Sequence, residues 1–217
     1  MLSDLIKGKL IIFAAPSGAG KSSLIKKIVE SSDGKIELSV SVTTRSPREG
    51  EEHGRDYFFV TDEEFNALKI DNAFIEHATV HEYQYGTLKT FIDEKTNSGK
   101  DIILDIDVQG YEQIKKSFED TVSIFILPPS LEELEQRLKD RGLDSENVIK
   151  KRLVNAKSEL MYAENFDHIL VNDNFEKTIE YLKLIIFDEK KSYDPRTVSY
   201  THLRAHETRG NLVCRLL

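Results

Sequence analysis

Residues 10–22 read LIIFAAPSGAGKS, and this stretch decides the fold. A short apolar run leads into a glycine-rich turn, Lys21 and Ser22 follow, and apolar residues then recur with helical spacing. A strand, a glycine-rich turn and a helix in this order predict a phosphate-binding loop, where backbone N–H groups and the positive helix N-terminus surround a phosphate. Lys21 can then reach the outer phosphates of a nucleotide, and the Ser22 hydroxyl can bind Mg²⁺.

The loop departs from the motif G-x-x-x-x-G-K-[ST] at its first position, where Ala15 replaces glycine. An ordinary glycine-rich turn would not explain a lysine directly after Gly20. We therefore expect ATP binding by the residues of the loop, which are Ala15, Pro16, Ser17, Gly18, Ala19, Gly20, Lys21 and Ser22.

Composition limits the possible partners. A length of 217 residues, 39% of them hydrophobic, suits an α/β domain with insertions. The net charge of −8 argues against nucleic acid or an anionic membrane as main partner, so we expect small-molecule substrates.

The first apolar run is too short for a signal peptide, and no run approaches the roughly 18 apolar residues of a spanning helix. With Cys214 as its one cysteine, the chain has no intramolecular disulfide framework, and we expect a cytoplasmic protein of undetermined oligomeric state.

Apolar runs alternate with helical patterns along most of the chain. The runs at 10–15, 102–106, 122–127 and 169–171 predict buried parallel strands, and helical patterns occupy 21–31, 108–117, 130–141, 145–164 and 174–189. This alternation predicts an α/β fold with a doubly wound parallel sheet. Two helix starts fit the capping box, Thr61 with Glu64 and Ser130 with Glu133.

Two segments do not follow this pattern. The alternation of apolar and polar residues over 38–43 predicts a strand, and further short strands near 57–60, 74–80 and 83–85 flank a helix at 62–70. Residues 38–90 are therefore predicted to form a small, mostly antiparallel insertion. Residues 198–217 show no sustained period, and we expect them to be a non-native tail.

Basic residues occur in two groups outside the phosphate loop. Arg45 and Arg48 flank a proline, so their guanidinium groups can converge on one dianionic group, and Tyr57 and Tyr85 could add hydroxyl donors. The second group consists of Arg137, Arg141 and Arg152. Arg137 and Arg141 lie four residues apart on a predicted helix, where like charges repel unless an anion lies between them. A solvated basic face is the alternative.

Carboxylates form the third chemical feature. Glu76 lies within an apolar stretch, and Asp105 and Asp107 alternate where a buried strand ends, the position of ligand sites in open α/β sheets. Buried carboxylates need partners. One could hold Mg²⁺ through water, and others could accept the N1–H and amine of guanine. The sequence leaves open which carboxylate holds the metal.

Taken together, these motifs resemble the guanylate kinase family over almost all of residues 8–190. The matching stretches are the phosphate loop, residues 41–50, Tyr57, residues 74–76, 85–87, 103–110 and 128–130, Arg137 with Arg141-Gly142, and residues 151–153 and 171–173. The resemblance implies transfer of the γ-phosphate of ATP to GMP, and to dGMP, giving GDP and ADP, with Mg²⁺.

The resemblance also implies a role for each candidate residue. Lys21, Arg137, Arg141 and Arg152 would be catalytic, and Ser22 with Asp105, through water, would hold the metal. The GMP phosphate would bind Arg45, Arg48, Tyr57 and Tyr85, and guanine would bind Ser41, Glu76, Thr87 and Asp107. The implied domains are a kinase core at 1–37, 91–136 and 159–190, a GMP-binding insertion at 38–90 and a helical lid at 137–158.

Two alternative functions share some of these motifs. Residues 107–110 mimic the D-x-x-G motif of small GTPases, but the chain has no [NT]-K-x-D segment to bind guanine. A catalytically inactive guanylate-kinase-like module that binds protein ligands is the other alternative. Such modules typically lack a working phosphate loop, whereas Lys21, Ser22 and the lid arginines are present here.

Overall fold

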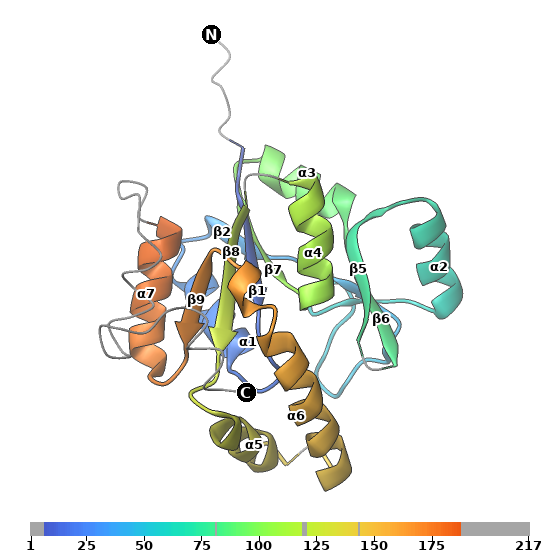
Figure 1. The fold of residues 1–217 in the computed structure, drawn as a ribbon. Coiled ribbons are helices and arrows are strands. Elements are labelled where there is room, and N and C mark those ends of the chain that lie inside the picture. The colour runs from blue at the N-terminus through green and yellow to red at the C-terminus, as the bar shows by residue number, and fades with distance from the viewer. Residues whose placement is uncertain (1–6, 81, 119–120, 143, 188–217) are drawn as a thin grey trace. The chain divides into compact units, whose positions relative to one another are not determined.

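The computed structural model describes residues 7–80, 82–118, 121–142 and 144–187 (Figure 1). The chain divides into two compact units. The first unit comprises Met1–Ile12 and Asp33–Thr121, and the second comprises Phe13–Ser32 and Val122–Leu217. The segment expected to be a non-native tail, 198–217, lies outside the described residues.

A parallel sheet has the strand order β2-β7-β1-β8-β9. These strands are β1 Leu10–Ala14, β2 Ile36–Leu38, β7 Asp101–Asp105, β8 Thr121–Leu127 and β9 His168–Val171. Within the first unit β2 pairs in parallel with β7, and within the second unit β8 pairs in parallel with β9. Every residue of β1 is buried, as continuous apolar strands covered on both faces should be. The prediction of an α/β fold with a mostly parallel sheet is confirmed.

Helices follow these strands as the sequence indicated. The predicted helices are α1 Lys21–Glu30, α4 Val108–Ser117, α5 Leu131–Asp140, α6 Glu146–Leu160 and α7 Phe175–Phe187. A short 3₁₀ turn, η1, covers Ala163–Asn165, and the helix α3, Lys89–Asn97, was not predicted. The N-cap of α3 is Leu88, which makes no side-chain cap, so no residue in the sequence marks its start.

Two helices of the second unit, α5 and α6, lie side by side in Figure 1. Leu134 and Leu138 of α5 pack with Ile149 and Ala156 of α6. This contact has its own apolar cluster, because both helices present an apolar stripe at a spacing of three to four residues.

The first unit also contains a smaller sheet, with strand order β4-β3-β6-β5. Its elements are β3 Val42–Thr43, β4 Phe58–Phe59, β5 Phe74–Val80 and β6 Tyr83–Leu88, together with helix α2 Asp62–Ile70. β6 pairs antiparallel with β3 and β5, and only β3 with β4 is parallel, so the prediction of a mostly antiparallel region is confirmed. Phe65 of α2 stacks on Phe74 of β5, at 4.6 Å between ring centroids, and closes the core of this region.

The prediction of a single strand over 38–43 was wrong. β2 ends at Leu38 in the parallel sheet, and β3 begins at Val42 in the smaller one. The Ser39 N–H still donates to the Ile103 carbonyl of β7, and the chain passes to the smaller sheet between this bond and Val42. Alternation of side chains cannot distinguish one strand from two short strands in different sheets.

The two predicted capping boxes differ in outcome. At α2 the Thr61 hydroxyl accepts from the Glu64 N–H and the Glu64 carboxylate accepts from the Thr61 N–H, as expected. At α5 the Ser130 hydroxyl accepts from the Glu133 N–H, but the Glu133 carboxylate binds Arg137 instead.

Within the described residues, no helix is both long and apolar enough to cross a membrane.

Candidate active site

The phosphate loop joins β1 to α1, and its backbone requires glycine. Gly18 and Gly20 have φ angles of 96° and 94°, and Gly20 is the N-cap of α1. Among the described residues, the non-glycine residues with positive φ are Asp33 and Asn72. Ala15 therefore has a conformation open to any residue, which explains why alanine can replace the first glycine of the motif.

A buried asparagine supports this loop. The Asn172 side-chain N–H donates to the Ala19 carbonyl at 2.8 Å, while its backbone N–H donates to Leu127. A Cβ placed on Gly20 would lie 2.4 Å from the Asn172 amide nitrogen, so Gly20 is needed for space as well as for its φ angle. Asn172 was not among the predicted site residues, because nothing in its local sequence shows that it reaches the loop.

Two of the predicted catalytic arginines are fixed in or near the loop. Arg152 on α6 donates from Nη1 to the Ser17 hydroxyl at 2.9 Å, and its Nη2 lies 3.3 Å from Asp144 Oδ1. Arg137 on α5 donates to the Asn172 carbonyl at 3.2 Å and pairs with Glu133. Arg152 therefore contacts the loop directly, and Arg137 contacts the residue that supports it.

Arg141 has a different position. α5 ends at Asp140, so Arg141 is its C-cap residue and not part of the helix, and its side chain is exposed. The expected repulsion between Arg137 and Arg141 is reduced, because Glu133, one turn before Arg137, supplies the opposite charge at 3.0 Å. Lys21 and Ser22 lie in the first turn of α1, with Ser22 exposed.

Three of the predicted guanine-binding residues meet in the first unit. Glu76 on β5 lies opposite Thr87 on β6, and the Thr87 hydroxyl donates to Glu76 Oε1 at 2.7 Å. The Ser41 hydroxyl lies 3.5 Å from the Thr87 hydroxyl. Glu76 is only 4% exposed, although it is an acidic residue. The arrangement places two hydroxyl groups and a carboxylate together, so it can both donate and accept hydrogen bonds.

Burial determines the protonation of Glu76. It raises the pKa of Glu76 to about 7, the Thr87 hydrogen bond opposes this rise, and the charge of Asp107 adds to it. Asp107 is the N-cap of α4, where Oδ1 accepts the Gly110 N–H at 2.9 Å. A Cβ on Gly110 would lie 2.6 Å from Glu76 Oε2, so α4 approaches Glu76 closely because Gly110 has no side chain.

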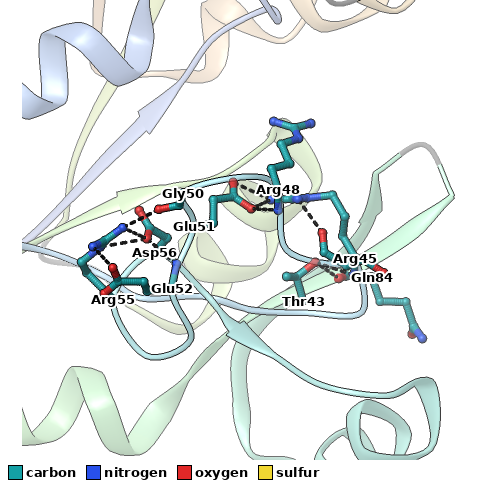
Figure 2. Close-up of polar contacts among 10 residues, drawn as sticks. Thr43, Arg45, Arg48, Gly50, Glu51, Glu52, Arg55, Asp56 and Gln84 are labelled. Atoms are coloured by element: carbon teal, nitrogen blue, oxygen red, sulfur yellow. Dashed lines mark hydrogen bonds and ion pairs between the residues drawn. The ribbon is translucent and has the colours of Figure 1, made fainter.

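The predicted phosphate-binding residues of the insertion also meet in part. Arg45 is 8% exposed, and its guanidinium carbon lies 5.4 Å from the centre of the Tyr57 ring. The Tyr57 and Tyr85 rings are 6.0 Å apart, and burial together with the charge of Asp105 raises the pKa of Tyr57. Arg48, by contrast, is exposed, and Figure 2 shows its guanidinium pointing away from Glu51.

Glu51 is the residue of this region that the sequence did not single out. Its two carboxylate oxygens each lie 2.9 Å from Arg45 Nη2, and Oε2 also accepts the Arg48 N–H at 2.8 Å (Figure 2). In the sequence Glu51 is one of several acidic residues in an exposed loop, so the partner of Arg45 could not be identified there.

Comparison with known proteins gives one consistent result. A family model described as guanylate kinase matches residues 7–189. A guanylate kinase of Legionella pneumophila is 49% identical, covering 86% of this chain and 88% of that protein, and one from Thermotoga maritima is 45% identical, covering 85% and 89%. The crystal structure of guanylate kinase from Anaplasma phagocytophilum has a TM-score of 0.68 and 33% identity, and covers 86% of this chain and 89% of that one. The chain belongs to the guanylate kinase family.

Proposed function

We propose that this protein is an ATP-dependent guanylate kinase, which transfers the γ-phosphate of ATP to GMP, and to dGMP, to give GDP and ADP. The observation that carries the proposal is the pairing of Glu76 with Thr87 beside Ser41. Guanine offers O6 as an acceptor and N1–H with its amine as adjacent donors. The ionised Glu76 carboxylate accepts from N1–H and the amine, and Asp107 is a further acceptor. The Ser41 hydroxyl donates to O6, or the Thr87 hydroxyl does so when it gives up its bond to Glu76.

On the ATP side, the phosphate loop binds the nucleotide with backbone N–H groups, and Lys21 holds the outer phosphates. Phosphoryl transfer needs little covalent chemistry from a protein, so positioned cations are the main source of catalysis. Arg137, Arg141 and Arg152 stabilise the charge of the transferring group. The contact of Arg152 with Ser17 supports this role, because it places a guanidinium at the loop.

On the GMP side, Arg45, Arg48, Tyr57 and Tyr85 bind the phosphate. A phosphate oxygen of GMP is already an anionic nucleophile, so no general base is required. We propose 38–90 as the GMP-binding region, 137–158 as a lid, and 1–37, 91–136 and 159–190 as the kinase core.

Mg²⁺ would be held by the Ser22 hydroxyl and, through water, by Asp105. Hydroxyl and carboxylate oxygens are the kinds of protein ligand that Mg²⁺ takes, and the ion draws its other ligands from phosphate and water. Ser22 is exposed in the first turn of α1, and Asp105 is partly buried. When bound, the ion would neutralise phosphate charge. Small-molecule partners and a cytoplasmic location complete the proposal.

A coupled assay of ADP formation tests it. We expect GMP to be a far better acceptor than UMP or dTMP, and activity to need added Mg²⁺. An inactive protein-binding module would bind ATP weakly and form no ADP with any acceptor. Such a result, obtained with folded protein, would refute the proposal.

A further inference from the structure

Arg45 is an almost buried cation with specific partners. Its side chain is 9% exposed and that of Glu51 is 20% exposed, and the two are joined at 2.9 Å. Burial alone would lower the pKa of Arg45, but the hydrogen bond and charge of Glu51, together with Tyr85, raise it. The guanidinium can remain in this place because a carboxylate balances its charge; a buried ion that loses its partner is strongly disfavoured.

Glu51 also orders the loop that carries both arginines. Its Oε2 accepts the Arg48 N–H at 2.8 Å, and its own N–H donates to the Arg48 carbonyl at 3.0 Å. The other end of the segment is tied to the sheet, where the Arg45 N–H donates to the buried Thr43 hydroxyl at 3.2 Å. One carboxylate therefore fixes the Arg45 side chain and the Arg48 backbone together.

The donor geometry of Arg45 leaves little freedom. Nη2 is used by both oxygens of Glu51, and Nη1 donates to the Ser46 carbonyl at 2.8 Å. The rings of Tyr57 and Phe59 lie 5.4 and 5.8 Å from the guanidinium carbon. Arg45 is thus a preorganised donor, whereas the exposed Arg48 side chain must be ordered when a ligand binds (Figure 2).

We infer that Glu51 is a positioning residue for GMP: it acts through Arg45, holding the guanidinium where the substrate phosphate binds, and does not itself contact the substrate. The inference rests on the proposed function. Without Glu51 the Arg45 guanidinium would turn toward water, and the protein would lose recognition of the phosphate but not of the base.

Binding measurements with GMP and guanosine, without ATP, test this inference. Guanosine lacks the phosphate and therefore reports on base recognition alone. We expect Arg45→Ala to weaken GMP binding by roughly 10- to 100-fold, the usual effect of losing a charge-assisted hydrogen bond. Glu51→Ala should weaken GMP binding to a similar degree and leave guanosine binding unchanged. The double variant should bind GMP no more weakly than Arg45→Ala, because both changes remove one contribution.

Glu52→Ala is the matched control. Glu52 is the neighbouring acidic residue, and its carboxylate pairs with Arg55 at 2.7 Å, so this variant should bind GMP as the wild type does. Should Glu51→Ala not fold, Glu51→Gln, which keeps an acceptor but no charge, should still show selective loss of GMP binding.

Each other outcome has a definite meaning. Unchanged or tighter GMP binding in Glu51→Ala, with Arg45→Ala impaired, would overturn the inference and leave the proposed function intact. Equal losses for GMP and guanosine would show a general structural role for Glu51, which also overturns the inference. Normal GMP binding by Arg45→Ala would instead contradict the proposed phosphate role of Arg45 itself.

Discussion

Glu76→Gln should make the ligand-free protein more stable at high pH while it damages the enzyme. The pKa of Glu76 is raised from 4.5 to about 7, chiefly by burial. Below pH 4.5 the carboxyl is neutral in both the folded and the unfolded chain. Between pH 4.5 and 7 the unfolded chain ionises while the folded chain keeps its proton on Glu76, so the free energy of unfolding falls as the pH rises, and above pH 7 the loss is complete. The pKa difference of about 2.5 corresponds to roughly 3 kcal/mol.

Glutamine has the shape of glutamate and can accept the Thr87 hydrogen bond, but it does not titrate. With urea m-values of about 1–3 kcal/mol/M, the variant should unfold at roughly 1–3 M more urea than the wild type at pH 9. At pH 5 the two proteins should differ little. Glu82→Gln, which changes an exposed residue, is the control and should show no such pH dependence. A stability difference between Glu76→Gln and wild type that is equal at pH 5 and pH 9 would refute the reasoning.

Three further substitutions test other parts of the structure. Lys21→Ala should leave the unfolding transition intact and lower kcat by about 10²–10³-fold, the cost of losing one preorganised charge; near-normal turnover would contradict the role of the loop. Gly20→Ala should lower the free energy of unfolding, measured in urea, by more than Gly142→Ala does. Both glycines have positive φ, but only the Cβ at Gly20 meets a neighbour, Asn172, so equal losses would argue against that contact. Thr87→Val removes the bond that lowers the pKa of Glu76, so the pH midpoint of the stability loss should move upward; an unmoved midpoint would show that the bond is unimportant.

The sequence predicted most of the fold because its elements have local marks. The run before the phosphate loop and the Thr61–Glu64 box are examples, and each was found where expected. Helix α3 was missed because Leu88 makes no cap, and the 38–43 alternation was misread because pairing partners are not encoded locally. Elements that depend on distant pairing cannot be located from spacing alone.

The same distinction applies to the candidate site. Glu76 could be chosen from the sequence, because a carboxylate within an apolar stretch needs an unusual environment. Its contact with Thr87 comes from β5 and β6 pairing across the sheet. Glu51, Asp144 and Asn172 support site residues through contacts that only the folded chain creates, and nothing in their spacing separates them from solvated polar residues.

Acceptor preference tests the central claim most directly, since the claim is that Glu76, Thr87 and Ser41 read guanine. Adenine places an acceptor where guanine has N1–H, so AMP would leave the Glu76 carboxylate mispaired. The measurement is kcat/KM for GMP and AMP in the wild type and in Glu76→Gln. We predict that the wild type prefers GMP by about 10⁴-fold, and that Glu76→Gln lowers kcat/KM for GMP by about 10²-fold or more. A wild type that phosphorylates AMP as well as GMP would contradict the account.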